Sequence, residues 1–382
     1  MTPRWRAHLL YVAWLLGVGG IGAWGVSVLA RSTEAWRFLK TPHLGFNGPV
    51  HRADPDLGFA AVPGARGLHT FPIGPPFPMR YDARGFRIPA YESPARPLTR
   101  PLLLALGCSY TYGDACPAEK TYSWLVAERL GATNLNAGKC AYGLAQMLLI
   151  AREVIPKERP EFVLVQQSPW LVGRGVSGFA RATFGTVPVP YFTEDGGLRI
   201  APPAFRARLF DLPLQRYDNP RRGSREFASF VWNVGLPLFA HDDLQLGLFQ
   251  ARRLIGRVPA PAADEAEVVL AAYREIHAVC RAAGSLMVVV RLSQPLDQAP
   301  PPLGGLGREE GVVVVRAQEA LNRQVPEGTK EAYRRRFAHW RGDPPQLVDT
   351  HPNPAAHAVI ADEIMAAIGR AGSRLAAETG TR

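Results

Sequence analysis

The chain has 382 residues, of which 47% are hydrophobic and 20% are charged, with four cysteines and a formal net charge of +11. This apolar content excludes a wholly disordered chain, and the length is sufficient for one large α/β domain. The positive charge is spread along the sequence as arginine without an interleaved aromatic motif. We therefore expect no DNA or RNA partner, whereas an anionic surface or a glycan stays open as a partner.

The first thirty residues predict a membrane anchor. Arg4 and Arg6 precede Leu9–Ala30, a run of about 22 residues without a charge, close to the roughly 20 residues that cross a bilayer. A cleavable signal peptide usually has an apolar region of only about 7–15 residues, so an uncleaved anchor is favoured, with Val28-Leu29-Ala30 as the alternative cleavage site. The arginines before the run predict that the amino terminus stays inside and that the rest of the chain faces the periplasm or the exterior.

The remainder of the chain reads as a leader and one catalytic domain. Residues 1–40 form the anchor and its flank, 41–100 a Pro/Gly-rich leader packing on the domain, 101–372 the domain itself and 373–382 a tail. Strands and helices alternate in the domain, which predicts a parallel sheet covered on both faces, a three-layer α/β/α class. The expected elements are strand 101–106, helix 118–130, strand 133–136, helix 143–155, strand 162–167, an insertion at about 171–262, helix 264–283, strands 285–291 and 311–315, helix 316–324 and a last helix 355–369.

The octapeptide GCSYTYGD, residues 107–114, follows the apolar run that ends at Leu106. Ser109 therefore emerges where a buried strand stops and a helix is about to begin, at the sheet edge where α/β proteins bind ligands. Gly107 and Gly113 allow close approach of the backbone on either side. Ser109 is the candidate nucleophile. The alternative is a turn in which Ser109 or Thr111 only caps the next helix.

A candidate base lies near the carboxyl end of the chain. The segment Asp349-Thr350-His351-Pro352-Asn353 precedes the last expected helix. Serine is a weak nucleophile until an imidazole takes its proton, and a carboxylate on the other ring nitrogen orients that imidazole. Ser109, His351 and Asp349 would supply these three parts. Taken alone, a histidine before proline is more often a turn residue.

A third segment supplies candidate oxyanion donors. Asn136-Ala137-Gly138 ends the short strand around Leu135, so a glycine amide here would face the same sheet edge as Ser109. Tetrahedral intermediates need N–H donors aimed at the developing negative charge. The backbone amides of Ser109 and Gly138 are the candidates.

Because of the segments around Ser109, Gly138 and His351, the chain resembles the SGNH hydrolase superfamily, the GDSL esterases and lipases, in its bacterial envelope form. GCSYTYGD is similar to the first signature block, NAGKCAYG to the second and DTHPNPAAHAVIA to the last, and GLHTFPIGPPFPMRYDARGFRIP is similar to the leader of such proteins. The resemblance covers roughly residues 50–370. It implies a flavodoxin-like parallel sheet, a Ser-His-Asp triad without a metal or cofactor, and a single-pass protein of the bacterial inner membrane.

Two departures from the family pattern stand out. Trp170 falls where the third block carries an oxyanion asparagine, so Gln166, Gln167 or Ser168 would have to substitute, unless these are ordinary strand-end residues. The last block has its aspartate two residues before the histidine rather than three, a spacing that related envelope acetyltransferases share. Asp343 is the fallback orienting residue.

The remaining candidates are cysteines, aromatic residues and other histidines. A disulfide between Cys116 and Cys140 would brace the oxyanion loop and is compatible with an exported protein, whereas Cys108 and Cys280 are interpreted as packing residues. Aromatic residues of the insertion either line an acyl or sugar cleft or pack a lid: Phe179, Phe184, Tyr191, Phe192 and Trp232. The histidines without a partner signature are taken as structural: His241, His277 and His339. His357, one turn into the last expected helix, is interpreted as a support of the His351 loop and not as a base.

The sequence thus predicts a membrane-anchored serine esterase that hydrolyses O-acyl, chiefly O-acetyl, esters of a small molecule or an envelope glycan. One alternative is an O-acyltransferase that passes the acyl group to a polysaccharide hydroxyl. The other is a binding module without catalysis, suggested by the missing third-block asparagine. The acyl group, the alcohol and the oligomeric state are left open.

Overall fold

In the computed structural model, the described residues are 3–32, 45–47, 50–70, 73–182, 185–200, 244–257, 264–297 and 303–379, with a few isolated positions between 225 and 262. Side chains are described over a narrower set, which leaves out residues 23–32 and 372–379 among others. His241 and Phe184 lie outside the described residues.

A parallel sheet forms the centre of the described chain. Its strands are β7 (Leu102–Leu106), β8 (Thr133–Asn136), β9 (Phe162–Gln167), β14 (Leu286–Arg291) and β15 (Val312–Val315). They lie side by side in the order β8-β7-β9-β14-β15, and each adjacent pair is parallel. Numbered by their appearance in this parallel set, the order is 2-1-3-4-5, which is the flavodoxin-like order. The expectation of a mainly parallel α/β sheet is confirmed.

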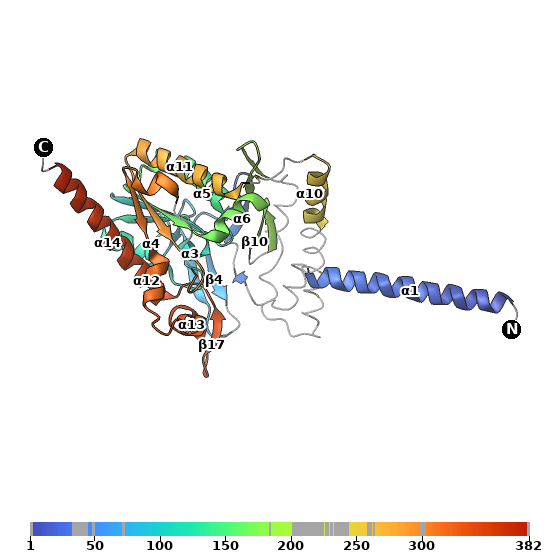
Figure 1. The fold of residues 1–382 in the computed structure, drawn as a ribbon. Coiled ribbons are helices and arrows are strands. Elements are labelled where there is room, and N and C mark those ends of the chain that lie inside the picture. The colour runs from blue at the N-terminus through green and yellow to red at the C-terminus, as the bar shows by residue number, and fades with distance from the viewer. Residues whose placement is uncertain are drawn as a thin grey trace.

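Each face of this sheet is covered by helices. Along β7, Leu102, Leu104 and Leu106 belong to one apolar cluster, whereas Leu103 and Ala105 belong to another, as alternation along a strand requires. The first cluster includes side chains of α5 (Leu144–Glu158) and α11 (Glu265–Ala283). The second includes side chains of α4 (Tyr122–Arg129), α12 (Ala317–Arg323) and α14 (Pro354–Thr379). Figure 1 shows these two helical layers with the sheet between them.

The leader extends the same sheet. Strands β1 (Gly45–Asn47), β4 (Arg66–Thr70), β5 (Phe77–Tyr81) and β6 (Arg87–Ile88) follow β8 in antiparallel pairings, so the main sheet of the described chain has nine strands. The strands β2 (His51–Asp54) and β3 (Gly58–Ala61) form a separate hairpin, which comes between β1 and β4 in the sequence. The sequence predicted that the leader packs on the domain but did not predict these strands, because each is short and has no clear alternation.

Most element boundaries in the domain lie within a few residues of those expected. The largest difference is at the last helix, which was expected to end at 369 but runs to Thr379 as α14, into the expected tail. Residues 118–120 also differ, since they form a 3-10 turn (Ala118–Lys120), while Thr121 caps α4 by accepting a hydrogen bond from the amide of Trp124. Elements that the sequence did not predict are α3 (Ser109–Tyr112), α6 (Pro169–Ser177), the hairpins β10–β11 (Phe179–Ala182, Gly185–Pro188) and β12–β13 (Pro190–Phe192, Leu198–Ile200), α10 (Leu244–Leu254), α13 (Lys330–Phe337) and the hairpin β16–β17 (His339–Arg341, Gln346–Asp349).

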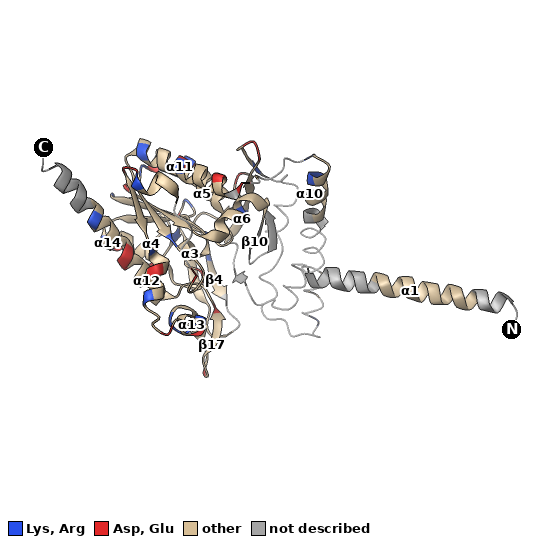
Figure 2. Cartoon of the chain, in the orientation of Figure 1, with Lys and Arg blue, Asp and Glu red and all other residues tan. Residues whose placement is uncertain are grey.

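The amino-terminal segment is the helix α1 (Pro3–Ser32). Figure 2 shows its described side chains free of Lys, Arg, Asp and Glu, whereas both signs of charge are interspersed over the helices that cover the sheet. Within the part of the chain whose side chains are described, no helix has the length and apolarity needed to span a membrane. The expected anchor, Leu9–Ala30, lies partly outside that part.

Candidate active site

Ser109 lies at the end of β7, as the sequence predicted. Leu106 ends the strand and Ser109 begins the four-residue helix α3. The turn requires glycine at 107, because a Cβ there would lie 1.9 Å from Thr111 Oγ1. Ser109 is 6% exposed, and its Oγ donates to Cys108 Sγ at 3.8 Å. The hydroxyl therefore lies at the carboxyl edge of the sheet and is buried against Cys108.

A buried arginine of the leader holds the loop that follows Ser109. Arg87, on β6, is 2% exposed and donates to the backbone carbonyls of Tyr112, Gly113 and Cys116. Its guanidinium also stacks over the Tyr112 ring, with 4.2 Å between Cζ and the ring centroid. Hydrogen bonds from a charged donor are stronger than neutral ones, so this contact fixes the backbone that carries Ser109. The sequence analysis missed Arg87, because a lone arginine in a proline-rich leader carries no local signal.

His351 and Asp349 form the predicted pair. Strand β17 ends at Asp349. The Asp349 Oδ1 atom accepts hydrogen bonds from His351 Nδ1 and from the His351 backbone amide, both at 2.7 Å. Burial lowers the pKa of His351, but the bond to Asp349 and the nearby carboxylates outweigh it and raise this pKa to about 9. Burial raises the pKa of Asp349, yet the His351 hydrogen bond and charge bring it down to about 2. Asp349, and not the fallback Asp343, is the carboxylate on this ring.

The serine and histidine segments meet in space although they are far apart in sequence. The Tyr110 ring lies edge-on to the His351 ring, with centroids 5.6 Å apart. Among the described residues no hydrogen bond joins Ser109 Oγ to His351, since the Ser109 hydroxyl donates to Cys108 instead. Such bonds are often long in ligand-free enzymes and tighten when substrate binds. The roles of Ser109 and His351 therefore stay predictions.

The Gly138 amide has a partner in this structure. It donates to Asn136 Oδ1 at 3.0 Å, while Asn136 Nδ2 donates to the Thr111 carbonyl at 2.9 Å. A Cβ at Gly138 would lie 2.6 Å from the Tyr112 backbone nitrogen, so only glycine fits against α3. To act as an oxyanion donor, the Gly138 amide would have to exchange Asn136 for the substrate oxygen. Three residues later, Ala141 adopts a φ of 67°, a strained value for a non-glycine residue that the sequence did not signal.

The third-block substitutes surround Cys108. Gln166 Oε1 accepts from the Cys108 amide at 3.1 Å and from Thr111 Oγ1 at 2.8 Å, and its Nε2 donates to Ser168 Oγ at 2.8 Å. Trp170 Nε1 donates to Cys108 Sγ at 3.2 Å. Ser168 and Gln167 are both buried. Gln166 and Trp170 therefore brace the turn that carries Ser109, and the oxyanion roles of Gln167 and Ser168 remain predictions.

Cys108 is more than a packing residue in this structure. Burial raises the pKa of its thiol, but the charge of Arg174 and hydrogen bonds from Trp170, the Tyr110 amide and Gln166 lower that pKa overall. The sulfur next to the candidate nucleophile is thus an acceptor for several convergent donors.

The expected disulfide between Cys116 and Cys140 is wrong for this structure. All four cysteines are free and buried. Burial raises the pKa of the Cys140 thiol well above the usual value, and the nearby Asp114 carboxylate raises it further. The Cys116 segment is held instead by Arg87, which binds its carbonyl. Both loops do approach the same edge of the sheet, but the two thiols take different partners.

The remaining histidines have structural partners where they are described. His357 Nδ1 accepts the Tyr122 amide at 3.2 Å, and burial lowers its pKa to about 3. His339 Nε2 lies 3.2 Å from the Pro352 carbonyl, and burial lowers its pKa. His277 contacts Glu309 and the Glu310 carbonyl, both at 3.0 Å.

The described aromatic residues of the insertion mostly pack. Phe179 and Tyr191 lie against Phe249 of α10, Phe192 joins the main apolar cluster, and Trp232 is exposed.

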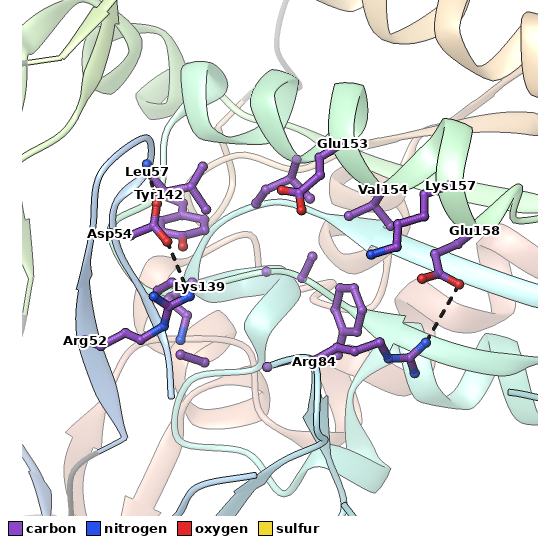
Figure 3. Close-up of a pocket in the computed structure, with 17 residues that line it drawn as sticks. Arg52, Asp54, Leu57, Arg84, Lys139, Tyr142, Glu153, Val154, Lys157 and Glu158 are labelled. Atoms are coloured by element: carbon purple, nitrogen blue, oxygen red, sulfur yellow. Dashed lines mark hydrogen bonds and ion pairs between the residues drawn. The ribbon is translucent and has the colours of Figure 1, made fainter. Parts of the chain in front are cut away.

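A charged cavity of about 330 Å³ opens beside Gly138. It lies between the β2–β3 hairpin, the turn before β6 and α5, and Figure 3 shows Arg52, Arg84 and Lys157 around it together with Asp54, Glu153 and Glu158. Lys139 is almost wholly buried there, over the Tyr81 ring at 4.7 Å, with Nζ 3.5 Å from His51 Nδ1. Burial lowers the pKa of Lys139 to about 7. The cavity is suited to a polar or charged group.

Three side chains of this region have the spacing of a metal site. One ligand atom from each of Asp114, Asp349 and His351 lies within 4.8 Å of the other two. The His351 nitrogen Nδ1 already binds Asp349, so its Nε2 is the nitrogen left for a metal or for a serine proton.

The scan against protein-family models matches none, and the search of curated proteins finds no match. Among solved structures, the crystal structure of TesA is similar at 11% identity and a TM-score of 0.33, over 71% of this chain and 99% of that one. The acetyl xylan esterase Est2A from the rumen bacterium Butyrivibrio proteoclasticus is similar at 11% identity and a TM-score of 0.29, over 71% and 63%. A carbohydrate esterase family 2 enzyme with a carbohydrate-binding domain from Corynascus thermopiles (Myceliophthora fergusii) is similar at 14% identity and a TM-score of 0.30, over 85% and 100%. Likenesses of this strength do not assign an activity to the chain.

Proposed function

We propose that this chain is a serine esterase of the SGNH type that hydrolyses O-acyl, chiefly O-acetyl, esters. The observation that carries the proposal is the meeting of the two distant segments. The Asp349–His351 pair is bonded at 2.7 Å, and its imidazole contacts Tyr110, the neighbour of Ser109. A strand-end serine beside an oriented imidazole is the arrangement that acyl transfer to serine requires.

In the proposed reaction, Ser109 Oγ attacks the ester carbonyl and its proton passes to His351 Nε2. Asp349 holds Nδ1–H and stabilises the imidazolium. The amides of Ser109 and Gly138 receive the oxyanion, the Gly138 amide leaving Asn136 as it does so. The tetrahedral intermediate collapses, the C–O bond to the alcohol breaks and the alcohol takes the proton from His351. Water, deprotonated by His351, then attacks the acyl-serine. The bond between the acyl carbon and Ser109 Oγ breaks, Oγ takes the proton from His351, and the free acid is released.

The substrate is proposed to be a polar acylated molecule, with an acylated envelope glycan as the first candidate. The charged cavity beside Gly138 supports this, because its lysine, arginine and carboxylate side chains offer hydrogen bonds to hydroxyl and acid groups. Release of acetate from acetylated glycans and from simple aryl esters, measured in parallel, tests the assignment. If the acyl group is transferred to a glycan hydroxyl while little free acetate appears, the enzyme is an O-acyltransferase instead.

The decisive experiment is labelling with a fluorophosphonate probe. We expect an adduct on Ser109 in the full chain, and no adduct in Ser109→Ala. Ser93→Ala, at an exposed leader position, is the matched control and should label normally. Ester hydrolysis by the Ser109→Ala protein would rule out the nucleophile.

A non-catalytic binding module is the second candidate. It is favoured by two observations, the Ser109 hydroxyl donating to Cys108 and the Gly138 amide donating to Asn136. If the correctly folded wild-type protein takes up no fluorophosphonate but binds an acylated glycan, the chain is a binding module.

We further propose that Leu9–Ala30 anchors the chain in the bacterial inner membrane, with the esterase in the periplasm. The uncharged length of this segment and the arginines before it support the proposal. Resistance to alkaline carbonate extraction, together with digestion by protease added to spheroplasts, is the expected result. Release of the chain by carbonate would contradict it.

A further inference from the structure

The acidic residue of the octapeptide, Asp114, has no part in the reaction above, yet it lies close to the residues that carry it out. It is 8% exposed, and its backbone amide donates to the Ser109 carbonyl at 2.9 Å, which ties it to the candidate nucleophile. Its Oδ1 lies 3.3 Å from Nδ1 of His69, on strand β4 of the leader. The Cys140 thiol lies near enough for the Asp114 charge to raise its pKa. Three chain segments thus converge on one buried carboxylate.

Asp114 also lies close to the imidazole of the proposed base. A carboxylate oxygen of Asp114, one of Asp349 and a ring nitrogen of His351 all lie within 4.8 Å of one another. Carboxylates this close repel each other, and a cation between them relieves the repulsion. The imidazolium form of His351 is a cation in the right place.

His69 does not take over that task. Burial lowers the pKa of His69, and this effect exceeds the opposite effect of Asp114, so the His69 ring is neutral at neutral pH. A neutral imidazole can hydrogen-bond to Asp114 but cannot neutralise its charge. His351 lies within reach of both carboxylates and can do so, because its pKa is raised to about 9. The Arg87 guanidinium is also near, but it is bound to the carbonyls of Tyr112 and Gly113.

We propose that Asp114 is a second carboxylate partner of His351, positioned by His69 of the leader, and that it stabilises the imidazolium which forms when Ser109 attacks. The proposal rests on the esterase function above. Asp114 does not touch the reacting atoms, so it is a positioning residue that acts through His351.

Several other groups near His351 also affect how readily its ring is protonated. Asp349 binds Nδ1, the Cys108 sulfur favours the charged ring, and Tyr110 lies against its face as a neutral phenol. The charges of His69 and His339, when protonated, would oppose it. Asp114 is distinguished among them because it adds a second full negative charge that the Asp-His pair alone lacks.

The test is the titration of His351 by NMR, with the ring assigned by loss of its signal in His351→Gln. In the wild-type full chain we expect a pKa near 9, and a value at or below that of free histidine, about 6.5, would overturn the proposal. In Asp114→Asn we expect the pKa to fall by about one unit or more. Asp362→Asn removes an exposed carboxylate of α14 and should leave the titration unchanged. Asp114→Ser is the second variant if the asparagine protein does not fold, and an unchanged pKa in either folded variant refutes the inference.

Kinetics give a second readout that a purely structural role would not move. For hydrolysis of an aryl ester, the acidic limb of the kcat/KM profile should shift to lower pH in Asp114→Asn, while the plateau at high pH falls about tenfold or more. A lower rate with an unshifted limb would count against the proposal. All measurements are repeated with EDTA, and a His351 titration in the wild type that EDTA changes would assign the cluster to a metal ion instead. Absence of any Ser109-dependent hydrolysis would defeat the esterase function, whereas the NMR titration would still decide the Asp114–His351 pairing.

Discussion

Arg87 of the leader and Gly113 of the serine loop are joined by a hydrogen bond of 2.7 Å, from the guanidinium Nη1 to the glycine carbonyl. The same guanidinium reaches the carbonyls of Tyr112 and Cys116. The loop that carries the candidate nucleophile is therefore held from outside the α/β domain that the sequence delimits.

Replacing this arginine should cost both stability and activity. In Arg87→Met we expect the free energy of unfolding to fall by roughly 3 kcal/mol or more, because three buried carbonyls lose a charged donor. Urea denaturation followed by circular dichroism measures the loss. Arg129→Met, which breaks only an exposed ion pair with Asp362, should change stability by less than about 1 kcal/mol. Equal effects of the two substitutions on stability would contradict the proposal that Arg87 holds the serine loop.

The glycine beside the candidate oxyanion hole should tolerate no side chain. Gly138→Ala places a Cβ 2.6 Å from the Tyr112 backbone nitrogen, and we expect a loss of about 1–3 kcal/mol together with loss of ester hydrolysis. Gly173→Ala is the matched control, because a Cβ at this helical position meets nothing within 4 Å. It should be neutral or stabilising by up to about 1 kcal/mol. Thermal unfolding of both variants makes the comparison, and a stable, active alanine protein at 138 would show that α3 does not pack as described.

The pH dependence of hydrolysis should be displaced toward alkaline values. His351 acts as a base only when neutral, and its pKa is about 9, so kcat/KM should rise about tenfold per pH unit at neutral pH and level off near pH 9. The sign follows from the two carboxylates nearby, which favour the protonated ring. A profile of aryl-ester hydrolysis from pH 5 to 10 measures it. A plateau already reached at pH 6 would mean that another group is the base.

The bond between Trp170 Nε1 and Cys108 Sγ should appear as an energetic coupling. Trp170→Phe removes the donor and Cys108→Ala removes the acceptor, and each should lower the unfolding free energy by about 1 kcal/mol or more. The double variant should lose less than the sum of the two, since the second change has no bond left to break. Strict additivity in urea denaturation would argue against the contact.

The cysteines should all titrate as thiols. Protein denatured without reductant should react with four equivalents of a thiol reagent per chain, because no cysteine is paired. Reaction of only two equivalents per chain would show that two cysteines are paired, as the sequence suggested.

The parts of this structure that could be predicted from sequence are the local ones. Buried apolar runs mark strands β7, β9, β14 and β15 almost to the residue, since strands covered on both faces read as continuous hydrophobic stretches. The Asp349–His351 pair was also predictable, because its members are two positions apart and the contact needs no knowledge of the rest of the fold.

What the sequence could not supply depends on pairing between distant segments. Strand β6 has only two residues, and its place beside β8 is a property of the whole sheet. Asp114 and His69 gave no signal, because a lone acidic or imidazole side chain is most often exposed. The disulfide prediction failed because proximity of two loops in the fold does not fix which way each thiol turns, and both thiols are free and buried in this structure.

The antiparallel pairing of β6 with β8 has a practical consequence for the production of a shortened protein. A shortened gene that starts just before the serine-bearing strand would encode the hydrophobic layers but omit Arg87 and His69, and it would expose an unpaired sheet edge. Such a fragment would be prone to aggregate and slow to turn over ester, whereas one that starts upstream of Gly45 keeps the reaction centre whole.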